Sequence, residues 1–209
     1  MAHQTAPTAS TASTDQTTLI KTLYHTYRHT TDLNLKGQFF SPTCIQICRP
    51  TPSYAATTRE QIVQYLRDAQ EGKIPVSDEF STSTHNPVVS EEPTPQEKAS
   101  GVYTIRPLLA SEFEFSTADV TAPVGFSPEE LRRKAEEEEW VGMRVDLWER
   151  GGRGLLVKVQ YWWRLEEVLE GERAVGEGRG REWKQCLHDI MYLGPSDGTE
   201  GKDGLEILE

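Results

Sequence analysis

The sequence predicts an α+β domain shaped as a cone, in which N-terminal helices pack over one face of a curved, mainly antiparallel sheet. Two features of the element order support this prediction: helical hydrophobic spacing comes first, and three long strand-like runs come last. A curved sheet under helices encloses a concave space, where small ligands bind. The length of 209 residues suits one sizeable domain, and the hydrophobic content of 36% indicates that part of the chain lies outside the core.

The N-terminal part is expected to contain a tail, helices and a first strand. Residues 1–16 are rich in Thr, Ser, Ala and Pro, so we expect a disordered tail and a domain that starts at Thr17. Hydrophobic residues then recur at helical spacing: Leu19, Ile20, Leu23, Tyr24 and Tyr27. A short helical piece follows, so helices are predicted over roughly 17–40. The run "TCIQICRP" then alternates like a strand.

The middle of the chain alternates predicted elements with a long polar segment. "TREQIVQYLRDAQEG" predicts a helix over 58–71, with Thr58 as its N-cap and Gly72 near its end. Residues 74–100 are polar and Pro-rich, so we expect a mobile insertion. "GVYTIRPLL" and "EFEFST" are typical of strands, and "SPEELRRKAEEEE" predicts a helix with Ser127 as its N-cap.

The C-terminal part predicts the long strands of the sheet. They are the runs "WVGMRVDLWER", "GLLVKVQYWWRLEEV" and "EWKQCLHDIMYLG". The first two are joined by a glycine-rich turn, and a polar insertion at 170–181 precedes the third. We therefore predict a single domain over 17–194, followed by a mostly polar tail over 195–209.

Charge and hydropathy exclude several classes of partner. The net charge is −11 and no basic stripe is present, so neither nucleic acid nor an anionic membrane surface is an expected partner. No run is long and apolar enough to span a membrane, and the N-terminus lacks the apolar core of a secretory signal. Three cysteines, Cys44, Cys48 and Cys186, have no disulfide-framework spacing and are expected to be buried free thiols. We therefore expect a cytoplasmic protein.

Polar residues in the middle of predicted strands are the first candidates for a site. His188 and Asp189 are neighbours in the last strand, so a regular strand points them to opposite faces, and the hydrophobic periodicity allows either of them to face the concave space. Arg144 and Asp146 are two residues apart, so they share one face of their strand. A planar guanidinium can hold two carboxylates at once, and two carboxylates in different environments can act as acid and base.

The order of elements, over Thr17 to Gly194, resembles the SnoaL-like branch of the nuclear-transport-factor-2-like superfamily. Three stretches resemble motifs of limonene epoxide hydrolase and its relatives: "PTPSYAATTREQIVQYL", "MRVDLW" and "HDIMY". The resemblance implies an Asp-Arg-Asp triad at the bottom of an apolar pocket, formed by Arg144, Asp146 and Asp189. In this assignment Asp189 is the base that activates water, and Asp146 is the acid.

The resemblance also implies the remaining features of a ligand site. Gln46 and Cys48 stand where the family holds the attacking water with Tyr and Asn, which favours a related cyclase, isomerase or dehydratase over a hydrolase. Gln46 and Tyr54 are candidate ligand contacts. The implied function is an acid–base enzyme for a small, mostly apolar molecule, with no cofactor. The alternative is a non-catalytic ligand-binding or dimerisation module of the same fold.

Electrostatics favours Asp189, rather than His188, as the residue that faces the concave space. An ionised carboxylate there is costly unless a charged donor holds it, so we expect Arg144 to lie between Asp189 and Asp146. If His188 faces that space instead, His188 with a tyrosine becomes the acid–base candidate, and dehydration or cyclisation is favoured over epoxide opening.

Aromatic and histidine residues complete the candidates. In "YWW" we expect Tyr161 and Trp163 to line the ligand space and Trp162 to lie on the opposite face, where it would suit a homodimer interface. His25 and His29 have helical i, i+4 spacing but no third metal ligand, so no metal site is predicted.

Overall fold

A computed structural model describes residues 14–71, 73, 101–149, 155–167, 180–200 and 207–208. The predicted insertion at 74–100 and nearly all of the insertion at 170–181 lie outside the described residues, as do residues 1–13 of the predicted tail. The N-terminal elements are α1 (Thr14–His29), α2 (Leu33–Gly37), β1 (Phe40–Cys48), the short 3₁₀ helix η1 (Pro52–Tyr54) and α3 (Arg59–Gln70). The predicted helices over 17–40 and 58–71 are confirmed.

The second half of the chain supplies most of the sheet. Its helical segments are η3 (Ala110–Glu112), α4 (Ala118–Thr121), η4 (Ala122–Val124) and α5 (Pro128–Glu137). Its strands are β2 (Gly101–Pro107), β3 (Val141–Glu149), β4 (Leu155–Glu167), β5 (Arg181–Pro195) and β6 (Ile207–Leu208). The last of these lies within the segment predicted as a polar tail, where it pairs with β2.

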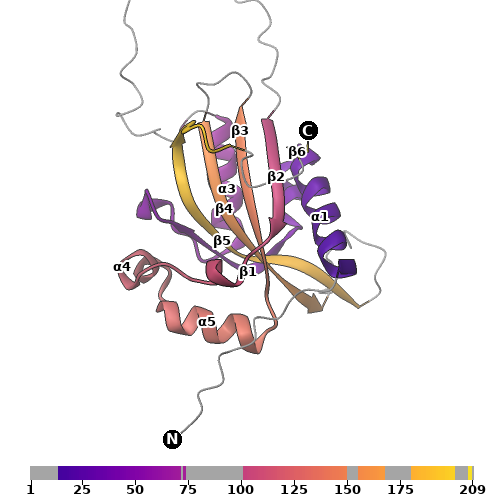
Figure 1. The fold of residues 1–209 in the computed structure, drawn as a ribbon, viewed down its shortest axis with the longest axis vertical. Helices are drawn as coiled ribbons and strands as arrows, with labels where there is room; N and C mark the ends of the chain where they lie inside the picture. The colour runs from indigo at the N-terminus through magenta and orange to yellow at the C-terminus, as the bar shows by residue number, and fades with distance from the viewer. Residues whose placement is uncertain are drawn as a thin grey trace, which may run out of the picture.

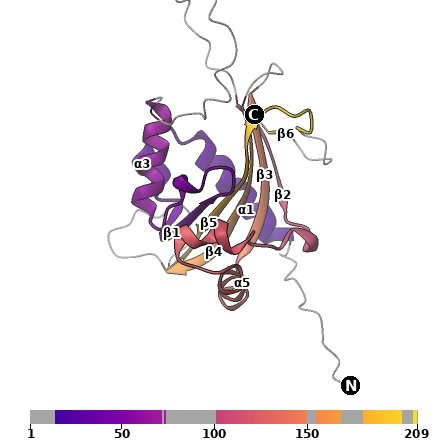
Figure 2. The same ribbon diagram turned by 90° about the vertical axis from the view of Figure 1, so that its left-hand side faces the viewer.

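The strands form one six-stranded sheet in the order β1-β5-β4-β3-β2-β6. Among the described residues, the β1–β5 pair is parallel and the four other strand pairs are antiparallel. The strands curve strongly (Figure 1), with α1 and α3 beside the sheet and α5 across its lower end (Figure 2). The predicted fold class, an α+β cone with a mainly antiparallel curved sheet, is confirmed.

Local sequence signals explain where two helices begin. Thr58 precedes α3, and its side chain accepts a hydrogen bond from the backbone N–H of Gln61. Ser127 and Glu130 form a reciprocal capping box before α5: the Ser127 side chain accepts from the Glu130 backbone N–H, and the Glu130 carboxylate accepts from that of Ser127. These bonds satisfy backbone donors that a helix leaves unpaired at its N-terminus.

Each face of the sheet has its own hydrophobic cluster. The face covered by α1 and α3, here called the α1 face, carries residues that include Met143, Val145, Val159, Tyr161 and Trp163. The opposite face, here called the α5 face, packs against the segment 108–140 through residues that include Ile45, Ile47, Trp162, Cys186 and Leu187. The predicted separation of Tyr161 and Trp163 from Trp162 is therefore confirmed.

The segment 108–140 overturns two expectations. "EFEFST" forms no strand of the sheet: Phe113 and Phe115 instead pack their rings on Trp162, with centroids 4.9 and 4.8 Å from it. The alternation that predicted a strand reflects this packing. Trp162 is fully buried within its own chain, so the argument that placed a homodimer interface on it is wrong. A homodimer stays a prediction without that support.

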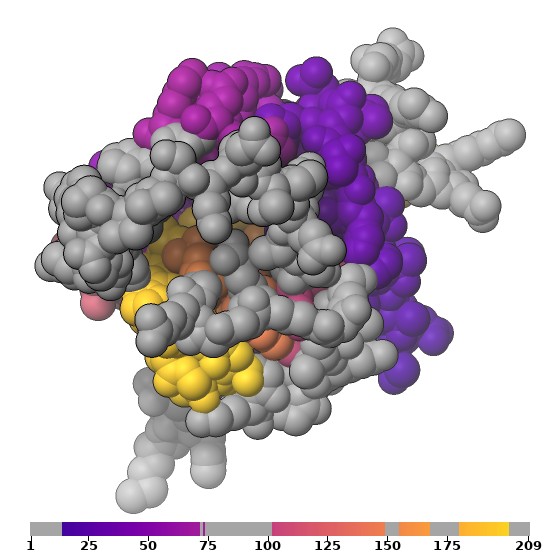
Figure 3. Space-filling view, turned by 90° about the horizontal axis from the view of Figure 1, so that it is seen from above, coloured from indigo at the N-terminus to yellow at the C-terminus, as the bar shows by residue number. Residues whose placement is uncertain are grey.

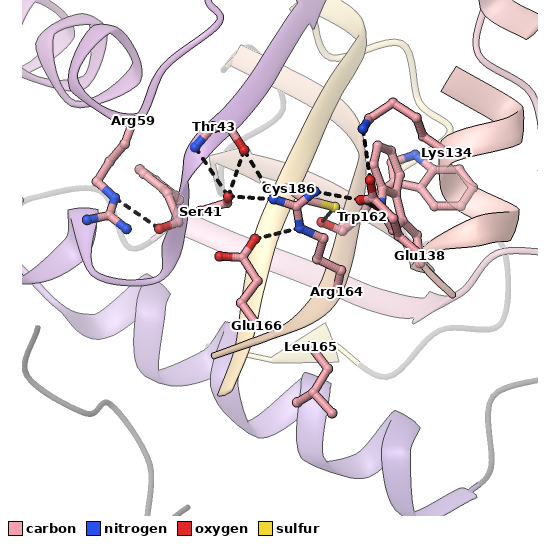
Figure 4. A network of polar contacts seen from close by, with 12 residues as sticks. Ser41, Thr43, Arg59, Lys134, Glu138, Trp162, Arg164, Leu165, Glu166 and Cys186 are labelled. Atoms are coloured by element: carbon pink, nitrogen blue, oxygen red, sulfur yellow. Dashed lines mark hydrogen bonds and ion pairs between the residues drawn. The ribbon is translucent and has the colours of Figure 1, made fainter. Parts of the chain in front are cut away.

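A polar network fastens the end of this segment to the sheet (Figure 4). Arg164 on β4 donates to Glu138 beyond α5 at 2.6 Å, to Glu166 at 2.5 Å and to Ser41 on β1 at 3.0 Å. Burial acts to raise the pKa of Glu138, but hydrogen bonds from Lys134, Trp140 and Arg164 lower that pKa to about 2. These charge-assisted hydrogen bonds tie the end of the segment 108–140, here called the cover, to the sheet. They therefore hold the cover over the α5 face.

Candidate functional site on the α1 face

The structure separates the two neighbours His188 and Asp189 onto opposite faces, as a strand requires, but in the order opposite to the prediction. His188 faces the α1 side, where its ring contacts Phe40 and Tyr161 with centroids 5.0 and 4.8 Å away. Asp189 lies on the α5 side and is fully buried. The prediction that Asp189 faces the space under α1 is therefore wrong.

An irregularity in β5 changes which of its residues share the α1 face with His188. The pairing with β4 shifts between Trp162 and Trp163, so Leu187 opposes Trp162 whereas Gln185 opposes Trp163. One extra residue, Cys186, is accommodated there, and both Cys186 and Leu187 pack in the α5-face cluster. A bulge changes which residues share a face, so simple alternation fails across it.

The predicted Asp-Arg-Asp triad is not formed. Arg144 donates from Nε to Asp146 Oδ1 at 2.8 Å, and its Nη1 lies 3.5 Å from the Met191 sulfur. Arg144 and Asp146 alternate with Met143 and Val145 of the α1-face cluster, so they lie on the α5 face. The pair exists as predicted, but it is on the side of the sheet opposite to the N-terminal helices.

Asp189 has a different partner, which the sequence analysis did not identify. Arg49, just after β1, donates from Nε and Nη2 to the two carboxylate oxygens of Asp189 at 2.9 and 2.7 Å. Arg49 also donates to Glu114 in the covering segment at 3.2 Å. Burial raises the pKa of Asp189, although the hydrogen bonds and charge of Arg49 oppose that rise. This bidentate pair holds β1, β5 and the cover together on the α5 face.

His188 is a neutral imidazole held by one hydrogen bond. Burial lowers the pKa of His188 to about 3, so the ring carries a single proton near neutral pH. Its Nε2 lies 2.6 Å from Oε1 of Gln185, which is also buried. When Nε2 donates its proton to that oxygen, the lone pair of Nδ1 is left to accept a proton.

One tyrosine contacts this histidine on the α1 face, and two more lie in the same cluster. Tyr161 lies directly opposite His188 in the β4–β5 pair, and its ring is 5.1 Å from that of Tyr24 on α1. Tyr27 packs on the ring of Phe40 at 5.6 Å. Burial raises the pKa of Tyr24, Tyr27 and Tyr161. These hydroxyls therefore stay protonated near neutral pH and can act as hydrogen-bond donors.

The predicted ligand contacts are arranged as follows. Tyr161 and Trp163 lie on the α1 face with His188, and both are buried. Gln46 pairs with His188 in the parallel register between β1 and β5, and its amide Nε2 donates to the carbonyl oxygen of Tyr54 at 2.8 Å. The Tyr54 ring lies 5.9 Å from that of Tyr65 on α3. The structure thus brings His188, Tyr161, Trp163 and Gln46 to one region and ties Tyr54 to it through Gln46.

The same region contains residues that the sequence analysis did not assign to a site. Tyr24 and Tyr27 belong to the hydrophobic stripe of α1, and Gln185 and Phe40 lie on β5 and β1. Helical spacing placed the two tyrosines toward the sheet, but it gave no sign that they pack beside Tyr161 and Phe40, the two rings that contact His188. Seen from above, orange strand atoms remain visible between the N-terminal helices and the yellow C-terminal residues (Figure 3).

The remaining sequence candidates have structural positions. His25 and His29 stack with centroids 4.1 Å apart, and His25 Nδ1 lies 2.6 Å from the Tyr103 hydroxyl. Within the described ranges, no three His, Cys, Asp or Glu side chains are grouped to hold a metal ion. Cys44, Cys48 and Cys186 are buried and free, which confirms that prediction. No helix in the described part of the chain has the length and apolar character to cross a membrane.

Comparison with known proteins places the chain in a family. Neither the curated proteins nor the solved structures contain a match to this chain. A family model for the SnoaL-like domain matches residues 9–209, which is most of the sequence and includes the whole described sheet. The fold of this family binds small molecules and often catalyses reactions without a cofactor. The curved sheet under N-terminal helices agrees with that match, and the chain belongs to the SnoaL-like domain family.

Proposed function

We propose that the protein is a cofactor-independent acid–base enzyme that acts on a small, mostly apolar molecule bound against the α1 face. The observation that supports this best is the buried, neutral His188, opposite Tyr161 in the sheet and hydrogen-bonded to Gln185. A buried imidazole is an unusual choice for a hydrophobic core, because its ring nitrogens require partners. It is a common choice for proton transfer.

The proposed reaction is proton transfer at a carbon next to a carbonyl group. Nδ1 of His188 takes the proton, and the electron pair of the C–H bond moves onto the carbonyl oxygen to give an enolate. The hydroxyl of Tyr161 donates a hydrogen bond to that oxygen. Return of the proton to the same carbon completes an exchange. Its return to another carbon is isomerisation, and loss of a neighbouring hydroxide, protonated as it leaves, is dehydration.

This proposal favours dehydration, isomerisation or cyclisation over epoxide opening. The carboxylates Asp146 and Asp189, assigned as acid and base of an epoxide hydrolase, lie on the α5 face and have separate arginine partners. His188 and Tyr161 on the α1 face offer a base and a weak acid instead. Within the proposal, therefore, His188 takes the role assigned to Asp189 from the sequence.

Proton exchange tests the proposal without knowledge of the natural substrate. β-Tetralone, an apolar ketone with acidic α-protons, is incubated with the protein in D₂O, and loss of the α-proton signal is followed by NMR. The protein should accelerate exchange, and His188→Gln should reduce that acceleration by about 100-fold or more. His29→Gln, at an exposed position of α1, is the matched control and should retain it. Equal exchange with His188→Gln would refute the role of His188.

The alternative is a non-catalytic ligand-binding or dimerisation module. One observation favours it: His188 is only 4% exposed, and Phe40 and Tyr161 flank its ring as core side chains do. Such a module would bind β-tetralone, detected by saturation transfer from protein to ligand, without any exchange of its α-protons. Exchange that depends on His188 excludes this alternative.

A further inference from the structure

Two half-buried positive side chains flank the tyrosines of the α1 face. Arg28 on α1 lies with its guanidinium carbon 5.9 Å from the ring centroid of Tyr103, and its charge interacts with Tyr24, Tyr27 and Tyr161. Lys36 on α2 places its ammonium nitrogen 4.8 Å from the ring centroid of Tyr27. Both charges therefore lie against rings of the same tyrosine cluster.

Neither charge has a carboxylate partner among the residues that the structure describes. The half-buried arginines of the sheet differ in this respect, because each has an acidic partner: Arg49, Arg106, Arg144 and Arg164. Burial and the nearby charge of Arg28 lower the pKa of Lys36 to about 8. A half-buried cation next to another cation is costly, and a bound anion would relieve both charges.

A third group points to the same ligand. The hydroxyl oxygen of Tyr24 is buried and forms no hydrogen bond of standard geometry within the described part of the chain, although the hydroxyl of Tyr161 and the charge of Arg28 both act on it. Buried hydroxyls are normally paired, so an unpaired one indicates a position that a ligand atom can fill. A carboxylate accepts several hydrogen bonds and matches both a guanidinium and a hydroxyl donor.

We propose that Arg28, Lys36 and the Tyr24 hydroxyl form a carboxylate-binding subsite, so that the ligand of the α1 face is an apolar molecule with a carboxylate at one end. This inference rests on the proposed function, because it places the carboxylate beside the region of His188. Arg28 and Lys36 act by binding and orienting the ligand. The apolar part of the ligand would lie against the aromatic rings of the cluster.

A matched pair of probes tests this subsite directly. Binding of 4-phenylbutyrate is compared with that of its neutral isostere 4-phenylbutyramide by NMR titration near pH 7. The wild-type protein should bind the carboxylate about tenfold more tightly than the amide. The Arg28→Gln, Lys36→Gln double variant should bring the two affinities within about threefold of each other. Lys21→Gln, on the same helix as Arg28, should keep the wild-type preference.

The outcomes separate this subsite from the proposed function. Equal affinity of the wild-type protein for both probes, or binding of neither, overturns the subsite while leaving His188-dependent exchange of β-tetralone unaffected. A carboxylate preference that persists in the double variant also overturns it. If the double variant does not fold, Lys36→Gln alone should reduce the preference by about threefold or more. The wild-type preference should also weaken as pH rises through about 8, where Lys36 loses its charge.

Discussion

Acid should destabilise this protein through His188 in a measurable way. The pKa of His188 is about 3 in the folded chain because the ring is buried, whereas an unfolded histidine titrates near 6.5. Between these values the unfolded chain binds a proton that the folded chain does not. Stability therefore falls as pH decreases below about 6.5, by about 1.4 kcal/mol for each pH unit. At pH 4.5 this amounts to about 2.5 kcal/mol.

The comparison of His188→Gln with the wild type isolates this contribution. Urea unfolding at pH 7 and at pH 4.5 gives the loss of unfolding free energy for each protein. The other titrating groups are present in both proteins, so their contributions cancel in the comparison. The wild type should therefore lose about 2.5 kcal/mol more unfolding free energy than the variant. His29→Gln, whose side chain is exposed, serves as the control and should lose as much as the wild type.

Equal acid losses in the wild type and His188→Gln would refute this reasoning. They would mean that the folded protein accepts a proton on His188 as readily as the unfolded chain does. That would contradict the burial of the ring between Phe40 and Tyr161.

Three further predictions concern the α5 face and the thiols. Arg49→Met leaves the fully buried carboxylate of Asp189 without its partner, so unfolding by urea at neutral pH should show a loss of about 3–5 kcal/mol; an unchanged midpoint would contradict a buried pair. Trp162→Ala opens a cavity under the covering segment and should cost about 3–5 kcal/mol, measured the same way, whereas a loss below about 1 kcal/mol would contradict full burial. Burial raises the pKa of Cys44 and Cys186, so Ellman's reagent should label these thiols only after denaturation; rapid labelling of the folded protein would show them accessible.

The sequence predicted the fold because its local signals agree with one another. The capping box before α5, the N-cap before α3 and the three long C-terminal strands all occur where the residue pattern indicates. Each depends on residues close together in the chain, so no knowledge of tertiary contacts is needed.

The site was harder to predict because it depends on two tertiary details. The bulge near Cys186 puts Gln185 and His188 on one face, whereas strict alternation would separate them. Arg49 lies 140 residues before Asp189 in the chain, so its bidentate bond to Asp189 left no signal in the sequence near Asp189. Because the partnership with Arg49 was not predicted, electrostatic reasoning paired Asp189 with Arg144. That pairing placed Asp189 on the wrong face of the sheet.

The cover over the α5 face was missed for a related reason. Trp162 was correctly placed opposite Tyr161 and Trp163, but an aromatic side chain on a sheet face looks the same in sequence whether another subunit or its own chain covers it. The packing of Phe113 and Phe115 on Trp162 distinguishes the two cases.

The most direct test of the account is to compare His188→Gln with Asp189→Asn in the exchange of β-tetralone α-protons. The two residues are neighbours in β5, but they face opposite sides of the sheet. Circular dichroism first verifies that both variants are folded. The account predicts that His188→Gln loses about 100-fold or more of the exchange rate, while Asp189→Asn keeps a rate close to that of the wild type. Loss of exchange in Asp189→Asn with retention in His188→Gln would contradict a site on the α1 face.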